Sequence, residues 1–362
     1  MRSLAVARGV LSVALLALLG LAAACDPSDG RPEPTADPED ATPRPSDDPA
    51  PLVEPSPAPT PDPPPEDRPD HPADTPPPRH VWVAVEDADR TVLVDLDAGA
   101  IVADVATPGG PHNLTVAPDG TSATALYAAS ELAIIADGQV QLVTLGDRPH
   151  DVKATDDWFV VANEAGRRVE LVSLAGEPGP TIDLPGEPHD LAIDHAGEQA
   201  WVTLNRRDDL AVIDLASATI DRHVATGHAP HDLLFAPDGR LWVTDWTGLL
   251  LVLDGDEVVH RRELGVEAHH LAFTPDGREA WITDHGTNEL FVLDTDSIDV
   301  IDVIGLPGAP HHVAITPDGA RAAVADHTNG ELLVFDVATR EPVGTVAVGP
   351  GPHGVWAVPP LG

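Results

Sequence analysis

The sequence predicts an all-β fold over about residues 80–362, a seven-bladed β-propeller with four-stranded blades. Three observations predict it. A histidine-bearing segment recurs seven times, apolar and polar residues alternate between its copies, and the two ends of the repeat region complement each other. A period near 40 residues with only strand-like content is typical of propeller blades.

One aligned histidine marks each copy of the repeat. Typical segments are GGPHNLTVAPDG, GEPHDLAIDHAG, HAPHDLLFAPDG and GAPHHVAITPDG, and successive histidines are 38, 39, 42, 38, 42 and 42 residues apart. The aligned residues are His112, His150, His189, His231, His269, His311 and His353. Seven histidines therefore predict seven innermost strands, one for each blade.

Each copy contains four β-prone runs. In one of them, residues 189–194, 199–204, 209–215 and 219–226 read HDLAID, QAWVTL, DLAVIDL and TIDRHVAT. Their alternation and β-branched residues predict strands, and the HAG or PDG tripeptides between them predict tight turns. One copy therefore supplies one four-stranded blade.

The two ends of the repeat region are expected to share a blade. Residues 80–86, 91–97 and 100–107 supply its second, third and fourth strands, and the missing innermost strand is residues 352–358 at the other end. This pairing closes the ring and removes a sheet edge that would otherwise be exposed.

The N-terminus predicts export. Residues 1–24 have a basic start, an apolar run and three alanines before Cys25, which is typical of a signal peptide. The segment LAAAC resembles the lipobox of bacterial lipoproteins, which implies lipidation of Cys25, the only cysteine, and a lipid anchor in the bacterial cell membrane with the protein facing outward. Residues 25–79 hold 20 of the 39 prolines and many acidic residues, which predicts a disordered tether.

The charge restricts the partners. The chain has 60 acidic against 20 basic residues and a formal net charge of −40. Such a surface repels nucleic acid, which is bound by neutralising its phosphates with cations, and it favours cationic ligands. We expect a monomer whose partners are a membrane, through the anchor, and a protein or cell-envelope ligand.

The repeat histidines are candidate metal ligands. Because neighbouring strands are antiparallel, the seven histidines that open the innermost strands should ring one mouth of the central channel, near the ends of the second strands. Two adjacent repeats carry extra histidines, and imidazole suits divalent transition metals such as Cu or Zn. The metal candidates are His269, His270, His285, His311, His312 and His327, with Asp284 and Asp326 as carboxylates that would orient their rings.

Other interpretations stay open. The histidines could be inherited with the repeat and only hydrogen-bond a neighbouring blade. A metal-assisted lyase or hydrolase could use the same mouth, with His269, His311 and Glu86 in catalytic roles, or the propeller could recognise a protein without metal through Trp246. The chain has no nucleophile elbow, phosphate loop or HExxH motif, so a binding or scaffold module is favoured over an enzyme.

The repeat resembles a known family. The segments PHDLAIDHAGEQAWVT, HHLAFTPDGREAWITDHGTNELFVLDTDS and HHVAITPDGARAAVADHTNGELLVFDVAT are similar to the YVTN-type β-propellers, which include YncE-like exported proteins. The tryptophan-bearing second strands also resemble virginiamycin-B-lyase-like propellers. The resemblance covers about residues 81–358 and implies the fold, but not one function, because such propellers serve many roles. Histidines on inner strands are shared with the copper-binding propeller of nitrous oxide reductase, whose activity is not implied, because this chain lacks that enzyme's second domain and cysteine ligands.

Overall fold

The computed structural model describes residues 79–227 and 229–359. The predicted signal segment and Cys25 lie outside the described residues, as does the predicted tether up to residue 78. No helix in the described part is long and apolar enough to cross a membrane.

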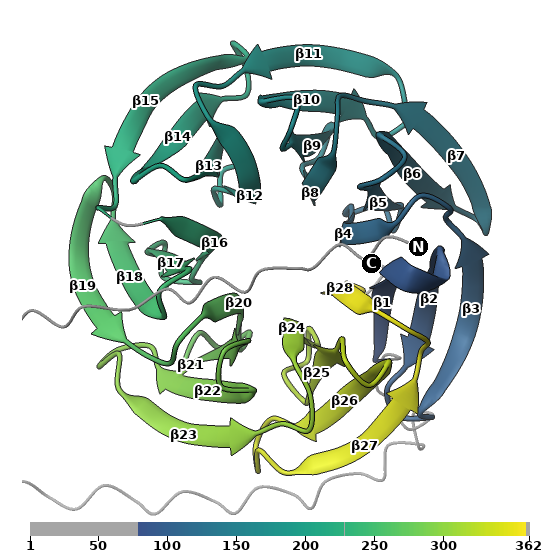
Figure 1. Ribbon diagram of the computed structural model, residues 1–362, viewed down its shortest axis with the longest axis vertical. Coiled ribbons are helices and arrows are strands. Elements are labelled where there is room, and N and C mark those ends of the chain that lie inside the picture. The colour runs from purple at the N-terminus through teal and green to yellow at the C-terminus, as the bar shows by residue number, and fades with distance from the viewer. Residues whose placement is uncertain (1–78, 228, 360–362) are drawn as a thin grey trace, which may run out of the picture. The chain divides into compact units, whose positions relative to one another are not determined.

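The described residues form seven antiparallel sheets of four strands each, arranged as blades around one axis (Figure 1). The predicted seven-bladed propeller is therefore confirmed. We number the blades in chain order, with blade 1 made by both ends of the repeat region. The innermost strands of blades 1 to 7 are β28 (Pro352–Ala357), β4 (Pro111–Val116), β8 (Pro149–Ala154), β12 (Glu187–Ile193), β16 (Pro230–Phe235), β20 (Ala268–Phe273) and β24 (Pro310–Ile315).

The remaining strands follow outward in the same blade order. The second strands are β1 (His80–Val85), β5 (Ser122–Leu126), β9 (Trp158–Asn163), β13 (Gln199–Asn205), β17 (Leu241–Asp245), β21 (Glu279–Asp284) and β25 (Arg321–Asp326). The third strands are β2 (Arg90–Asp95), β6 (Glu131–Ala136), β10 (Arg168–Ser173), β14 (Asp209–Asp214), β18 (Leu249–Asp254), β22 (Glu289–Asp294) and β26 (Glu331–Asp336). The outermost strands are β3 (Ala100–Ala106), β7 (Gln139–Thr144), β11 (Pro178–Asp183), β15 (Thr219–Ala225), β19 (Glu257–Glu263), β23 (Val300–Gly305) and β27 (Pro342–Ala347). A short 3₁₀ turn, η1 (Glu86–Ala88), follows β1.

The ring closes in blade 1. Strand β28 pairs antiparallel with β1, with Trp356 opposite Trp82 and Val355 opposite Val83, and Figure 1 shows the last strand inside the first. The predicted sharing of this blade by both ends of the chain is confirmed. Each end of the repeat region thereby gives the other the hydrogen-bonding partner that an open sheet would lack.

The hydrophobic core lies between neighbouring blades. Val83 and Val92 of blade 1 pack with Val334 of blade 7, and Trp242 and Trp281 are fully buried. Because both faces of the middle strands are covered by adjacent blades, their sequences are nearly continuous apolar runs. The outermost strands alternate instead, since one of their faces meets water.

A β-bulge near the start of the inner strands directs side chains into the channel. In β12, Pro188 pairs with Leu204 and Leu191 with Val202, so His189 and Asp190 together oppose one residue of β13, Thr203. The same register shift occurs in β4, β16, β20 and β24. A bulge bends its strand and re-aims the extra side chain. It explains how both the aligned histidine and the residue after it reach the channel.

Candidate metal centre

The seven aligned histidines form a closed ring of contacts around the axis. Neighbouring ring centroids are 3.7 to 5.0 Å apart, from His112–His353 at the short end to His269–His311 at the long end. The other contacts are 4.3, 3.8, 4.8, 4.2 and 4.2 Å. All seven imidazoles therefore lie inside one channel mouth, and six of them are buried.

The residue after each aligned histidine forms a second layer in the channel. The members are Asn113, Asp151, Asp190, Asp232, His270, His312 and Gly354. His270 and His312 stack with centroids 3.4 Å apart. This layer was missed by the sequence analysis except for the two histidines, although its position directly after the repeat histidine could have indicated it.

Asp190 is the polar centre of the channel. Its carboxylate accepts hydrogen bonds from Asn113 Nδ2 at 3.1 Å and from His189 Nδ1 at 3.0 Å, and it lies 3.4 Å from His150 Nδ1. Burial opposes ionisation, but the charges and hydrogen bonds of His189 and His150 hold the pKa of Asp190 well below its ordinary value. Asp190 in turn outweighs burial and raises the pKa of His150.

Asn113 fixes the proton positions of two rings. Because its Nδ2 donates to Asp190, its Oδ1 must accept, and it accepts from His312 Nε2 at 2.9 Å and His353 Nδ1 at 3.2 Å. His353 Nε2 therefore carries a lone pair. His189 likewise donates from Nδ1 to Asp190, which fixes the orientation of its ring.

Several buried imidazole nitrogens have no hydrogen-bond partner in the described part of the chain. They are His112 Nδ1, His231 Nε2, His269 Nδ1, His270 Nε2, His285 Nε2 and His311 Nδ1. Burial, helped by repulsion between the rings, lowers the pKa of all six histidines, so they are neutral near pH 7. Neutral imidazole is the form that binds a metal ion. Unpartnered buried polar atoms are costly, which calls for a ligand to satisfy them.

Four sets of residues could each hold a metal ion at this mouth. In each set the ligand atoms lie within 4.8 Å of one another, close enough for small side-chain rotations to bring three donors onto an ion with bonds of about 2.0–2.1 Å. The sets are His231–His269–His270, His269–His285–His311, Glu86–His112–His353 and His150–His189–Asp190. His269 belongs to two of them and is the central candidate ligand.

The remaining predicted residues lie beside these sets. His312 faces Asn113 and His270, and the His327 ring is 4.5 Å from His311 at the mouth. Asp284 Oδ2 accepts the backbone N–H groups of Val266 and Glu267, both at 2.9 Å. Asp326 likewise accepts the backbone N–H and side-chain amide of Asn329. The hydrogen bonds of these two carboxylates order loops at the mouth.

Two further side chains complete the mouth. Glu86 is partly buried, and burial, with a smaller effect of Asp87, raises its pKa. The centroid of the Trp246 side-chain ring lies 4.1 Å from that of His231 and 5.5 Å from that of His189. This tryptophan therefore packs against two of the seven aligned histidines. Trp246 therefore lies at the same mouth as the aligned histidines.

Solved structures share the architecture. A functionally unknown protein from Desulfotomaculum acetoxidans matches with a TM-score of 0.70 at 14% identity, over 78% of this chain and 99% of that one. Apo AztD from Citrobacter koseri matches with a TM-score of 0.60 at 14% identity, over 78% and 98% of the two chains. Kuenenia stuttgartiensis hydrazine synthase matches with a TM-score of 0.64 at 18% identity, over 68% and 89%. These likenesses show the fold.

No curated protein matches the sequence. A family model described as the YNCE-like beta-propeller matches residues 157–360, which is more than half of the chain and runs from β9 of blade 3 through blade 7 to the closing strand β28. The matched region includes the repeats with doubled histidines, in agreement with the resemblance found in the repeat motifs. The chain therefore belongs to the family of YNCE-like β-propellers.

Proposed function

We propose that this protein is an exported, lipid-anchored propeller that binds a divalent transition metal, zinc or copper, among the histidines of its channel. The observation that carries the proposal is the set of buried, neutral imidazole nitrogens without hydrogen-bond partners that converge at one mouth. Each such nitrogen left unpaired in a dry site costs about 1–3 kcal/mol, and a metal ion would offset that cost.

The surroundings favour a cation. Asp190 and Asp232 lie in the layer beneath the histidine ring, and the whole chain carries a formal charge of −40. The ring itself is closed by contacts through all seven blades, so its ligands are held by the core rather than by flexible loops. Such rigid support favours a defined coordination geometry.

A metal-assisted lyase or hydrolase is the second candidate. Glu86 is a carboxylate with a raised pKa next to His112 and His353, at the open end of the channel. A carboxyl group of this kind could exchange protons with a substrate if a metal there kept an open coordination position. The binding role needs no such position, and it is the one we favour.

The anchor part of the proposal rests on residues 1–79. Their pattern of a basic start, an apolar run, Cys25 and a proline-rich acidic segment supports an outward-facing propeller on a tether. An outward position would give the channel access to metal ions outside the cytoplasm.

The metal content of the loaded protein tests the proposal. The purified full chain is incubated with Zn²⁺ or Cu²⁺ and desalted, and its metal is measured by mass spectrometry. We expect near-stoichiometric metal in the unaltered protein and a loss of most of it in His269→Ala. The matched control is His260→Ala, because His260 is exposed on the outermost strand β19 and should leave loading unchanged.

Circular dichroism establishes that both variants are folded. If the unaltered protein retains no metal, or if His269→Ala retains as much as His260→Ala, the proposed metal site is wrong. The histidine ring would then be a structural feature of the repeat.

A further inference from the structure

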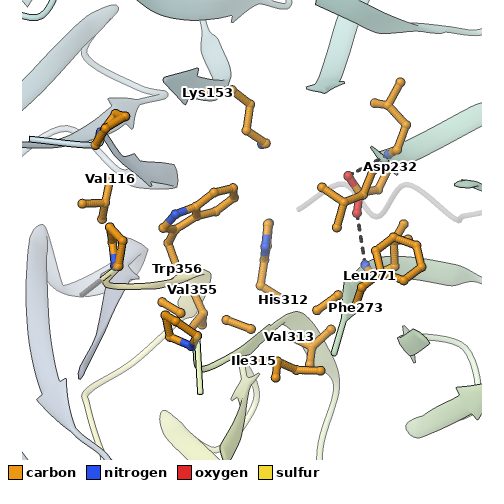
Figure 2. A pocket seen from close by; sticks show the side chains of 18 residues that line it. Val116, Lys153, Asp232, Leu271, Phe273, His312, Val313, Ile315, Val355 and Trp356 are labelled. Carbon is orange, nitrogen blue, oxygen red and sulfur yellow. Dashed lines mark hydrogen bonds between the residues drawn. The ribbon is translucent and has the colours of Figure 1, made fainter. Parts of the chain in front are cut away.

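A second cavity lies at the other end of the channel. It has a volume of about 510 Å³, and its walls are mostly apolar, with Leu234, Phe273, Ile315, Val355 and Trp356 among them (Figure 2). These residues come from the second halves of inner strands whose first halves carry the ring histidines, so the cavity is remote from that mouth. Its size falls within the range of about 300–1,000 Å³ that is usual for small-ligand sites.

The free volume of this cavity depends on the size of the side chain at one position of the inner strands. On five blades the third residue after the ring histidine lines the cavity, and the size of this residue differs strongly between blades. Lys153 and Trp356 are large, while Ala272 and Ala314 on blades 6 and 7 are small. The small residues at this position on blades 6 and 7 therefore leave room in the channel, which larger side chains of the other blades border.

Carboxylates outnumber lysines beside the inner end of the cavity, with Asp151, Asp190 and Asp232 against Lys153. Lys153, the only lysine of the chain, binds both carboxylate oxygens of Asp151 at 2.7 and 2.6 Å, and its ammonium lies 5.5 Å from the centre of the Trp356 ring. Asp190 is held by His189 and Asn113. Of the three carboxylates, Asp232 lines the cavity and has no lysine or arginine partner among the described residues.

The carboxylate of Asp232 accepts backbone hydrogen bonds but forms no ion pair with a described lysine or arginine. Its oxygens accept the backbone N–H groups of Leu233 at 2.8 Å and Leu271 at 3.1 Å, as the dashed lines in Figure 2 show. The nearest basic side chain is His270, at 3.1 Å, whose own pKa is lowered well below its ordinary value by burial, so it is neutral. Among the described residues no lysine or arginine lies within ion-pair distance of Asp232. Burial, and then repulsion by Asp190, raises the pKa of Asp232 well above its ordinary value.

We infer that this cavity binds a small organic cation, with its apolar body against Phe273, Ile315 and Trp356 and its ammonium group toward Asp232. An ammonium there would lie beside the Asp232 carboxyl group as a hydrogen-bond donor, and the aromatic faces can also interact with a cation. An anionic ligand is disfavoured because Lys153 is already bound to Asp151 and the chain as a whole is strongly acidic. This inference does not require a metal at the histidine mouth, although Asp232 lies 3.1 Å from His270, a member of one metal set there.

Three probes that share a phenyl ring and differ in charge test the inference. They are phenethylamine, propylbenzene and phenylpropionate, titrated by calorimetry into chelator-treated full-length protein. We expect the amine to bind about tenfold more tightly than the carboxylate, with the neutral probe between them. Stronger binding of phenylpropionate would instead make Lys153 the recognition group, and absence of binding by all three probes would show that the cavity is not a ligand site.

Two variants separate charge from shape. Asp232→Asn should lower the affinity for phenethylamine to that for propylbenzene without changing the latter, whereas Ala314→Phe should fill the cavity and remove binding of all three. If Asp232→Asn keeps the preference for the amine, the assignment of Asp232 is wrong. Saturation-transfer contacts between bound phenethylamine and the rings of Phe273 and Trp356 locate the probe in the unaltered protein, even if a variant fails to fold.

A third variant separates this inference from the metal proposal. His269→Ala should keep the affinity for phenethylamine, because His269 lies in the histidine ring and does not line this cavity. Asp232 can also form a set with Asp190 and His270 that could hold a metal ion. If Zn²⁺ alone binds at this end and the amine does not, the cavity is part of the metal path and the organic-cation assignment is overturned.

Discussion

At the scale of single residues, the channel is unusual because it keeps many imidazoles neutral. Burial is the largest cause in each case, and neighbouring rings add to it because one protonated ring disfavours another. The pKa of His312 is lowered to about 3 by burial. His150 is the exception, since Asp190 raises its pKa. A metal ion can bind these neutral rings, because near pH 7 their lone pairs are not occupied by protons.

The metal-free protein should therefore lose stability in mild acid. Because the folded pKa of His312 lies below the unfolded value of 6.5, the unfolded chain takes up its proton first. The stability that this group contributes is present above pH 6.5 and is lost as the pH falls toward about 3, and the other neutral ring histidines act in the same direction. Urea unfolding at about pH 7.5 and about pH 5 checks this, and the midpoint should be lower at the acidic pH. An unchanged midpoint would contradict the neutral assignment.

The positions of some single residues could be predicted from the sequence, and the contacts of others could not. The ring of seven histidines follows from repeat spacing alone, because equivalent positions in a closed repeat must face the same axis. The role of Asp190 does not, since it depends on a bulge that turns one additional residue inward. The hydrogen bonds of Asp284 could not be inferred either, because its partners come from the loop that leads into the strand before it.

At the scale of elements, the inner strand of blade 1 differs from the others. Where six inner strands have Asn, Asp or His after the ring histidine, β28 has Gly354. A Cβ at this position would come within 2.6 Å of the His112 carbonyl oxygen and 3.0 Å of Asn113 Cα. Both atoms belong to the backbone of the neighbouring β4, so neither can move aside easily. The close approach of these two strands therefore requires glycine.

Gly354→Ala should thus destabilise the propeller and disturb His112. We expect the free energy of unfolding to fall by about 1–3 kcal/mol, as for other cases of overpacking, in urea titrations. The matched control is Gly344→Ala in the outermost strand β27, where an added Cβ meets nothing within 4 Å. Equal stability of the two variants would show that β28 and β4 have room to separate.

At the scale of the whole molecule, closure was the most predictable feature. The first repeat lacks an inner strand and the last segment supplies one, so the sequence alone indicates the β28–β1 pairing that the structure contains. Blade number, strand order and the position of the channel follow from it. The cavity at the far mouth was not predictable, because it arises from the relative sizes of side chains on different blades, such as Ala314 and Trp356.

The proposed anchor is also a property of the whole chain. Changing Cys25 to serine should move the protein from the membrane fraction to the soluble fraction of the producing cells, because lipidation requires the thiol. Detergent phase separation followed by immunoblotting checks this, with an unaltered chain in parallel. If Cys25→Ser stays with the membrane as fully as the unaltered chain, the tether is held by another means.

The most direct test of the metal proposal is a crystal structure of the zinc-loaded protein, with anomalous diffraction recorded on both sides of the zinc absorption edge. We predict an anomalous peak at the histidine mouth, about 2.0–2.1 Å from a His269 ring nitrogen and from nitrogens of at least two neighbouring rings. A structure with fully ordered ring histidines and no anomalous peak in the channel would contradict the proposal. It would leave a closed propeller whose histidines only pack against one another.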